Sequence, residues 1–507
     1  MRYISTRGGI APIPFAEAVM MGLATDGGLL LPEKLPTVSL AEIVGWRDLA
    51  YPELAVTVLR HFIDDIPPAE LTRLVRRSYT GFNHPEITPI VAHGDCHILE
   101  LFHGPTLAFK DIALQLLGNL FEYLLAASGD RMNILGATSG DTGSAAIYGV
   151  RGKERINIFI LHPYGRISPI QEKQMTTVLD ANVFNIAIRG TFDDGQAIVK
   201  KLFNDIPFKE QYQLGAINSI NWARILAQVV YYVYAALRLT EAQPGEGGRL
   251  SPGSQVDHAN RVSQVNQTNQ ASHANQAGRA NQVGHVSGVN QVDFAVPTGN
   301  FGDIFAGFVA RRLLPGLIGR LILATNENNL LTRFVQAGDY SVSAVRPTSS
   351  PSMDIQVASN FERYLYYLNG EDPQRTRQEM EDFIRTGSLR FNPERLAQIQ
   401  ADFVAQSADE AATLATIRNF YRDHGYLLDP HSAVGVYAAL ACRRPNIPLV
   451  CLATAHPAKF GAAVAAATGR PPALPPALAK LADQESRCQV LAAEPGVIKD
   501  FVIRHAL

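Results

Sequence analysis

The feature that most constrains the fold is a repeated alternation of short apolar runs and helical periods, which begins near residue 97. Repeated strand–helix units predict mainly parallel sheets with helices on both faces, an α/β fold. Ligands of such sheets bind in the loops at the carboxyl ends of the strands, so chemistry is expected in those loops. The predicted strands are the runs at 132–135, 156–161, 183–188, 293–297, 321–324 and 449–453.

Two segments depart from this alternation. Residues 1–92 carry helical patterns at 14–24 and 46–63, and we interpret them as a mostly helical N-terminal domain. Residues 241–292 are rich in Asn and Gln and contain no Phe, Trp or Tyr. Such a composition cannot bury enough apolar surface to offset the entropy of ordering, so it predicts a disordered insertion within a catalytic core of residues 93–507.

Composition excludes several classes of function. The chain has 45 basic and 47 acidic residues, without the basic excess that is typical of nucleic-acid binding. Its first residues contain no apolar stretch after the basic residues, so we expect no signal peptide, and no apolar run reaches the ~18 residues of a membrane span. Four scattered cysteines without a CxxC pattern indicate neither a disulfide framework nor a thiolate metal site, so no metal is predicted. We expect a cytoplasmic enzyme with a small-molecule substrate and no nucleic-acid or membrane partner, and the sequence leaves its oligomeric state open.

Two glycine-rich loops are candidate anion-binding sites. ATSGDTG (137–143) and PTGNFGD (297–303) each follow a predicted strand and lead into a helix. Backbone N–H groups and the positive end of the helix dipole favour an anion there. Neither loop has the GK[ST] of a phosphate-binding Walker loop or GxGxxG spacing. One such loop alone also fits an ordinary structural turn, whereas two indicate a ligand with two anionic ends or two anionic ligands.

Lys110 is the third candidate, in the string HGPTLAFKD (103–111). It follows a Gly-Pro turn and an apolar stretch and precedes a helix with an apolar face, so we expect its amine to be partly desolvated. Desolvation lowers the pKa of a lysine and favours Schiff-base chemistry. A lysine at a helix start is ordinarily solvated, but beside two anion-binding loops it fits a pyridoxal phosphate site, with the cofactor phosphate in one loop and a substrate carboxylate in the other.

Several strings in a fixed order make a resemblance specific. HGPTLAFKD, SGDTG (139–143), NSINWAR (218–224), GNFGD (299–303) and ATAHPAKF (453–460), with YISTRGG (3–9) and LATDGGLLLP (23–32), resemble the threonine synthase family, in the longer-chain form of the fold type II pyridoxal phosphate enzymes. The matches run from residue 3 to residue 460. The resemblance implies a two-lobed core of mainly parallel twisted sheets flanked by helices, preceded by a mostly helical N-terminal domain.

The resemblance implies a role for each matched residue. Lys110 is similar to the lysine that binds the cofactor aldehyde, and Thr454 to the hydroxyl that meets the pyridine nitrogen. Ser139 and Thr142 are expected to donate to the substrate carboxylate. Asp141 stands where many relatives of the wider fold carry Asn. A carboxylate there lies beside the cofactor hydroxyl or the substrate carboxylate, so we expect a proton or a cation to neutralise it. The residues expected to bind the cofactor phosphate are Gly299, Asn300, Phe301, Gly302 and Asp303.

The implied reaction makes the enzyme a carbon–oxygen lyase acting on phosphate: O-phosphohomoserine and water give threonine and phosphate by γ-elimination and β-addition of water, in threonine biosynthesis. The substrate phosphate needs a third anion site, for which Asn218, Ser219 and Arg224 are our candidates, because a guanidinium binds phosphate through two parallel N–H bonds. A helix cap at Asn218 or Ser219 with an interior salt bridge fits these residues equally well. His103 fits either a role in orienting phosphate or water, or a structural place in its turn.

Three other functions remain as alternatives. A threonine or serine dehydratase, or a phospho-amino-acid phospholyase, shares the lysine and both loops but needs no water addition, and the NSINWAR and HGPTLAFKD strings favour the synthase. A non-catalytic binding protein is expected to have lost the lysine or the glycines, which are intact here. A nucleotide-binding protein is disfavoured by the spacing of both glycine-rich loops.

Overall fold

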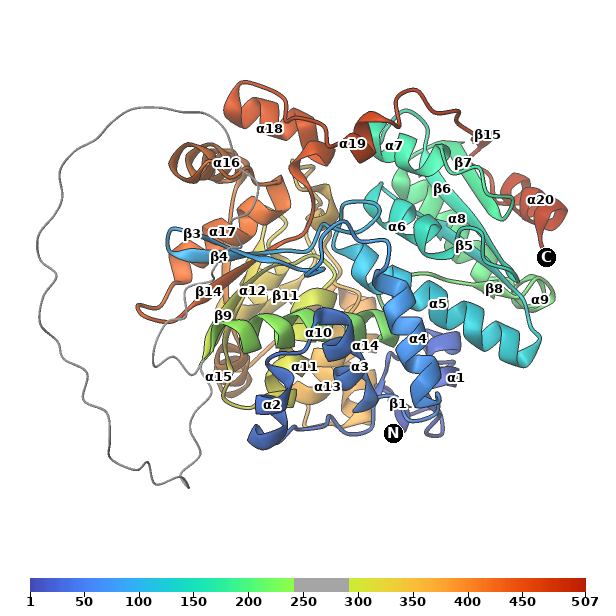
Figure 1. The fold of residues 1–507 in the computed structure, drawn as a ribbon. Helices are drawn as coiled ribbons and strands as arrows, with labels where there is room; N and C mark the ends of the chain where they lie inside the picture. The colour runs from blue at the N-terminus through green and yellow to red at the C-terminus, as the bar shows by residue number, and fades with distance from the viewer. Residues whose placement is uncertain (241–290) are drawn as a thin grey trace, which may run out of the picture.

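The computed structural model describes residues 1–240 and 291–507 (Figure 1). The predicted insertion therefore lies outside the described residues as far as residue 290, and Val292 already begins strand β9 (Val292–Pro297). Two sheets, one of six strands and one of five, organise the described chain. Because their strands are mainly parallel and helices flank them, the predicted α/β architecture is confirmed.

The six-stranded sheet combines strands from distant parts of the chain. Its order is β13 (Phe403–Ser407), β10 (Ile318–Thr325), β9, β14 (Leu449–Ala453), β4 (Cys96–Glu100) and β3 (Ile90–His93). The strands from β13 to β4 are parallel, and β3 is antiparallel to β4. Every residue of β14 is buried, which explains why this strand is an unbroken apolar run in the sequence.

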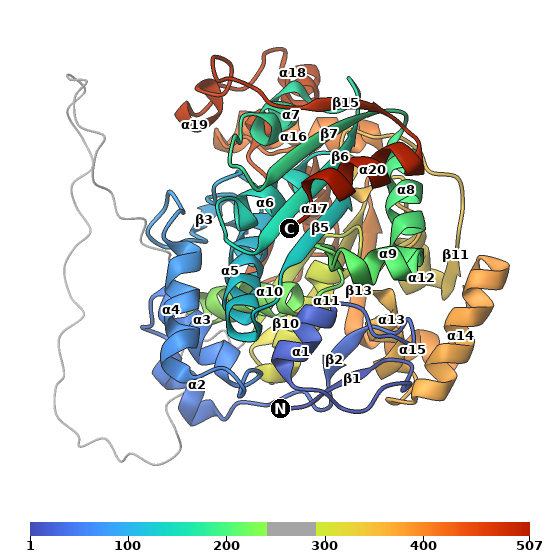
Figure 2. The same ribbon diagram turned by 90° about the vertical axis from the view of Figure 1, so that its right-hand side faces the viewer.

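The five-stranded sheet is parallel throughout. Its order is β15 (Gln489–Ala492), β7 (Val183–Arg189), β6 (Ile156–Pro163), β5 (Met132–Ala137) and β8 (Leu214–Gly215). Strand β15 and helix α20 (Pro495–His505) bring the C-terminus back onto this sheet, beside β7 and β6 (Figure 2).

The N-terminal region forms four helices and a two-stranded antiparallel ribbon. The elements are β1 (Tyr3–Ser5), α1 (Phe15–Met21), β2 (Leu30–Pro32), α2 (Leu40–Trp46), α3 (Tyr51–Arg60) and α4 (Pro68–Tyr79). The helical pattern predicted at 46–63 belongs to two helices rather than one, because Pro52 lacks an N–H and fits only the first turn of α3. Strand β3 lies across residue 92, where we predicted the domain boundary.

Helix α10 (Trp222–Leu239) lies at the centre of the molecule, and all of its residues except Arg238 are buried. It packs against α3, α5 (Lys110–Ser128) and α11 (Gly302–Leu313), while α17 (Pro430–Cys442) packs against β9, β10 and β14. Within residues 1–240 and 291–507, the structure contains no helix with both the length and the apolarity that a bilayer crossing requires.

Shorter elements complete the described chain. The helices are α6 (Asp141–Val150), α7 (Pro169–Thr176), α8 (Phe192–Asn204), α9 (Ile206–Gln211), α12 (Leu330–Ala337), α13 (Phe361–Leu368), α14 (Pro373–Thr386), α15 (Pro393–Asp402), α16 (Glu410–His424), α18 (Gly461–Thr468) and α19 (Pro476–Ala479). Two 3-10 turns, η1 (Pro351–Met353) and η2 (Pro457–Phe460), and a ribbon of β11 (Asp339–Ser341) and β12 (Ser388–Arg390) accompany them.

Two glycines set the close packing of α5 against α6. A Cβ atom on Gly118 would lie 1.9 Å from the carbonyl oxygen of Gly149, and one on Gly149 would lie 2.5 Å from that of Leu114. Both distances are far below van der Waals contact, so a larger side chain at either position would push the helices apart. This close crossing fixes the position of α5 relative to α6. The first residues of the two helices are Lys110 and Asp141.

Candidate active site

Three loops that carry predicted site residues leave the same edge of the six-stranded sheet. Strands β4, β14 and β9 are neighbours and parallel, so their carboxyl ends lie together. Strand β4 leads into the loop that ends at Lys110, Thr454 directly follows β14, and Gly299 lies just beyond β9. The sheet topology thus brings together three predicted residues that are far apart in the sequence.

The backbone around Lys110 is fixed by the segment after β14. The N–H of Phe109 donates to Thr454 O at 2.8 Å, and the N–H of His456 donates to Leu107 O at 3.0 Å. These bonds hold the start of α5 beside Thr454. On the other side, the carboxylate of Asp111 accepts hydrogen bonds from the N–H and hydroxyl of Thr106, at 2.8 and 2.7 Å.

The Lys110 amine is buried and close to several charges. Burial lowers its pKa to about 8; the charge of Asp141 opposes this shift, and those of Arg224 and Lys459 support it. The Nζ donates to Ser352 Oγ at 3.5 Å. A larger fraction of the amine is therefore neutral near pH 7 than in an exposed lysine, and the neutral form is the nucleophile and base.

The loop of residues 299–303 forms the second part of the site. Phe301 has φ +63° and caps α11 through its backbone conformation, and no side chain caps the helix. A Cβ on Gly299 would lie 2.7 Å from Ser352 O, so glycine is needed for this approach. Ser352 therefore contacts both this loop and Lys110. The first N–H groups of α11 are left for a ligand.

The carbonyl group of Asn300 and the carboxylate of Asp303 bind different parts of the chain. The carbonyl oxygen of Asn300 accepts hydrogen bonds from the N–H and the Nδ2 of Asn360, at 3.0 and 3.1 Å, which anchors the loop. The Asp303 carboxylate accepts from the hydroxyls of Tyr231 and Tyr232 at 2.5 and 2.8 Å, and burial raises its pKa to about 6. Because its carboxylate binds these two tyrosines of α10, Asp303 can offer a ligand at the loop its backbone N–H but not its carboxylate.

The SGDTG loop opens α6 in a similar way. Gly140 is the N-cap residue of α6; it has φ +143° and, as a glycine, no side chain of its own to cap the helix. The hydroxyl oxygen of Thr138 accepts from the N–H of Gly140 at 3.0 Å and from that of Gly143 at 2.9 Å, which fixes the loop. Ser139 is exposed and Thr142 is half-buried, so both hydroxyls are accessible to a ligand.

Of the proton or cation predicted to neutralise Asp141, the structure supplies a cation. Lys459, in η2, places its Nζ 2.8 Å from Asp141 Oδ1, and Gln171 Nε2 donates to the same oxygen at 2.7 Å. Although burial raises the pKa of Asp141, the charges of Lys459 and Lys110 hold it below its usual range. Lys459 lies within the string ATAHPAKF, but no local sequence feature distinguishes it from an exposed lysine.

Arg224 is buried at the start of α10, and burial lowers its pKa to about 10. Its Nη1 has no hydrogen-bond partner within residues 1–240 and 291–507, and no carboxylate of those residues lies within ion-pair distance of it. The alternative of a cap at Asn218 or Ser219 with an interior salt bridge is wrong: the cap is Asn221, whose Oδ1 accepts from Ala223 N at 3.0 Å.

Asn218 and Ser219 lie in the turn before this helix. Asn218 Oδ1 accepts from Ile220 N at 3.2 Å, and Ser219 Oγ contacts Ser359 Oγ at 2.9 Å. The carbonyl oxygen of Ser219 also accepts from Asn360 Nδ2 at 3.1 Å. Since Asn360 binds Asn300 as well, the turn is tied to the 299–303 loop.

His103 is engaged by other side chains. Its Nδ1 lies 2.8 Å from Asn83 Oδ1 and its Nε2 lies 2.7 Å from Glu100 Oε2. It lines a cavity of about 500 Å³ together with Tyr426 and His456. Lys110 does not line this cavity, so these contacts favour the structural interpretation of His103.

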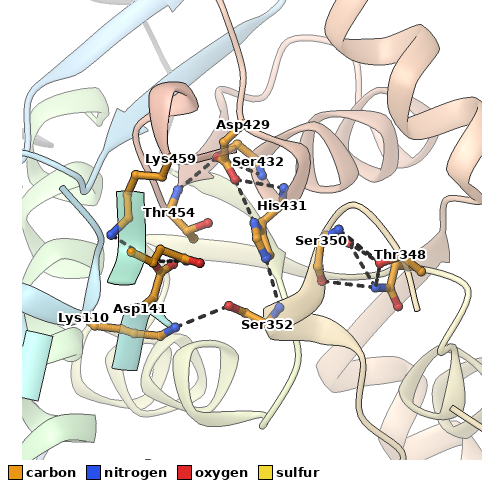
Figure 3. A network of polar contacts seen from close by, with 12 residues as sticks. Lys110, Asp141, Thr348, Ser350, Ser352, Asp429, His431, Ser432, Thr454 and Lys459 are labelled. Atoms are coloured by element: carbon orange, nitrogen blue, oxygen red, sulfur yellow. Dashed lines mark hydrogen bonds and ion pairs between the residues drawn. The ribbon is translucent and has the colours of Figure 1, made fainter. Parts of the chain in front are cut away.

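A chain of hydrogen bonds from Asp429 supports the site (Figure 3). Asp429 caps α17, and its carboxylate also binds the ring of His431, at 2.9 Å, and the hydroxyl of Ser432. His431 Nε2 accepts from Ser352 N at 3.2 Å, and Ser432 Oγ accepts from Thr454 N at 3.0 Å. Asp429 thereby positions Ser352, which contacts Lys110, and Thr454, which binds the neighbouring Phe109. Sequence reasoning missed Ser352, His431 and Ser432 in this role.

Comparisons with known proteins cover the whole chain. Residues 2–79 match the family described as "Threonine synthase N terminus", and residues 432–502 match "Threonine synthase, C-terminal". The chain is 44% identical over 510 residues to threonine synthase from Pseudomonas aeruginosa, covering 100% of this chain and 98% of the relative.

Two solved structures share the fold closely. The structure titled as PLP-bound threonine synthase from Brucella melitensis has a TM-score of 0.88 and 42% identity, and the match covers 100% of this chain and 99% of the other. Yeast threonine synthase has a TM-score of 0.87 and 38% identity, with 99% and 98% covered. The agreement extends over both sheets and the N-terminal helices.

Proposed function

The chain belongs to the threonine synthase family, and on that premise we propose how its residues divide the work of the reaction. It is a pyridoxal-phosphate-dependent lyase that forms threonine. Its proposed substrate is O-phosphohomoserine, which reacts with water and releases phosphate. The observation that carries the proposed division is the convergence of two helix N-termini, those of α6 and α11, near the buried amine of Lys110.

The residues present fit pyridoxal phosphate. The N-terminus of α11 has no side-chain cap, and a bare glycine backbone at 299 lets the loop approach Ser352, which contacts Lys110. We assign the cofactor phosphate to the N–H groups of residues 299–303, the cofactor aldehyde to Lys110, and the ring nitrogen to the Thr454 hydroxyl. When bound, the cofactor supplies a reactive aldehyde and a ring that delocalises electrons from the substrate.

Lys110 is the proposed acid and base. Once its Nζ is released by the substrate amine, its low pKa lets it take the proton from the substrate Cα near neutral pH. The same Nζ then moves protons at Cβ and Cγ, as the Cγ–O bond to phosphate breaks and water adds at Cβ. Ser352 Oγ, 3.5 Å from Nζ, orients the amine between these transfers.

Two further groups bind the ends of the substrate. The N-terminus of α6, with the accessible hydroxyls of Ser139 and Thr142, is assigned to the carboxylate. Arg224 is assigned to the phosphate, because its buried Nη1 has no partner within the described residues and its charge acts on Lys110. Asn218 and Ser219, in the turn that precedes its helix, are assigned to the same phosphate.

The product distinguishes this function from its nearest alternative. Purified holoenzyme incubated with O-phosphohomoserine in ¹⁸O-water should release equal amounts of threonine and phosphate, with one ¹⁸O atom in the threonine hydroxyl. The products would be separated and analysed by mass spectrometry. Release of 2-oxobutyrate and phosphate without threonine would instead establish a phospholyase.

The low pKa of Lys110 predicts how cofactor loading depends on pH. Only the neutral amine attacks the aldehyde, and raising the pH through the pKa increases the neutral fraction. The rate at which apoenzyme binds pyridoxal phosphate should therefore rise between pH 6 and pH 8 and level off above about 8. An exposed lysine, with a pKa of about 10.4, would show a continuing rise. Stopped-flow absorbance measures the rate at each pH, with Nα-acetyl-lysine, whose ε-amine is free, as the reference. A rate that still rises at pH 10 would contradict the lowered pKa of Lys110.

A further inference from the structure

A second lysine is buried at the site in addition to Lys110. Lys459 is 1% exposed, and its Nζ contacts Asp141 Oδ1 at 2.8 Å and Thr106 O at 2.6 Å. It thus joins three segments: η2, the start of α6 and the loop that leads to Lys110 (Figure 3). The cofactor and substrate roles proposed above do not use this amine.

Asp141 lies close to both lysines but pairs with one of them. Figure 3 shows its carboxylate between Lys110 and Lys459, with the ion pair drawn to Lys459. Gln171 donates to the same oxygen at 2.7 Å, so Asp141 Oδ1 binds both Lys459 and Gln171. The partner of Lys110 is instead Ser352.

The charges that act on Lys110 come from four elements of the fold. Asp111 lies on its own helix, Asp141 on α6, Arg224 on α10 and Lys459 on η2. Both carboxylates favour the charged amine and both cations disfavour it. If Lys459 were absent, Lys110 would be the remaining lysine or arginine of residues 1–240 and 291–507 whose charge acts on the buried Asp141 carboxylate, and a buried charge without a partner is strongly destabilised.

We propose that Lys459 is a positioning residue that holds the Asp141 carboxylate away from Lys110, so that the Lys110 amine stays free for the cofactor and for proton transfer. Asp141 and Lys459 act as one unit, in which a neutral residue at 141 would make the second lysine unnecessary. The inference deepens the proposed function and rests on it. Two observations carry the proposal: the side chain of Lys459 is completely buried, and its amine forms a direct ion pair with Asp141.

Three holoenzymes test the proposal: Lys459→Met, Asp141→Asn and the double variant. The readout is the pH at which the absorbance of bound cofactor changes by half. Lys459→Met should raise this midpoint by about one to three pH units, because it removes a cation and frees a carboxylate. Asp141→Asn should lower it, and the double variant should return it toward that of the wild type. Threonine formation at pH 7 should fall at least about 10-fold in Lys459→Met and recover partly in the double variant.

Two controls separate charge from packing. Lys153 is also buried and pairs with Glu122 at 3.1 Å, but at the far end of α5 and α6, so Lys153→Met should leave the midpoint unchanged. Lys459→Arg keeps the cation and should hold the midpoint near the wild-type value.

The proposal is overturned if Lys459→Met and the double variant show the wild-type midpoint, because loss of activity would then reflect packing alone. If Lys459→Met does not fold, Asp141→Asn still decides: an unchanged midpoint in that variant also overturns the proposal. Failure of the wild type to form threonine would reject the proposed function instead, while the midpoints, which need only bound cofactor, would still report on Lys459.

Discussion

Replacement of Lys110 by alanine should lower threonine formation about 10³- to 10⁴-fold, because the same amine is proposed to bind the cofactor and to move the protons at Cα, Cβ and Cγ. The absorbance of covalently bound cofactor should disappear from the purified variant. Burial of an ammonium group disfavours the folded state, so the melting temperature of the apoprotein should stay the same or rise. Loss of activity without loss of stability would mark a functional lysine.

The matched control is Lys153→Ala. Lys153 is buried to a similar extent and contacts Asn119 Oδ1 at 2.5 Å and Glu122 Oε2 at 3.1 Å, so its removal should lower stability and leave the specific activity of the folded protein unchanged. The interpretation of Lys110 is contradicted if Lys110→Ala retains a tenth or more of the wild-type turnover.

Arg224→Met should have the second largest effect, with opposite signs on function and stability. The value of kcat/KM for O-phosphohomoserine should fall at least about 100-fold, which corresponds to the loss of two charge-assisted hydrogen bonds to phosphate. The melting temperature of the holoenzyme should rise, because the variant no longer buries a guanidinium whose Nη1 has no partner within the described residues. Inorganic phosphate added to the holoenzyme should stabilise the wild type and not the variant.

Arg363 provides the comparison for Arg224. It is equally buried, but its guanidinium donates to Leu30 O, at 3.0 and 2.9 Å, and to Ile220 O, at 2.5 Å. Arg363→Met leaves these carbonyl groups without donors and should lower the melting temperature. If Arg224→Met also lowers the melting temperature and phosphate stabilises it as it does the wild type, Arg224 is structural and the phosphate binds elsewhere.

Patterns within a few consecutive residues predicted the central strands of the fold and the glycine-rich loops of the site. Strand β14 could be recognised because it is buried on both faces, and the glycines at 140 and 299 could be recognised because the backbone needs them. Strand β15 could not, since two of its residues are exposed and it pairs with β7 about 300 residues earlier in the chain. Its place depends on tertiary packing.

The supporting residues of the site were beyond prediction for a related reason. Ser352 and Lys459 reach Lys110 and Asp141 from distant segments, and neither has a distinctive local pattern. The sequence indicated that Asp141 needs a proton or a cation but did not identify Lys459 as its partner. The contacts of Asp429 with His431 and Ser432 could be seen only once the helix had been placed against Ser352 and Thr454.

The central claim is that the amine of Lys110, rather than that of the equally buried Lys459, binds the cofactor. Reduction of the holoenzyme with borohydride, followed by proteolysis and mass spectrometry, identifies the lysine directly, because the reduced cofactor stays attached to its nitrogen. We predict one pyridoxyl group per chain, on the peptide that contains Lys110, and an unmodified peptide around Lys459. A pyridoxyl group on Lys459, or on any lysine other than Lys110, would contradict the account.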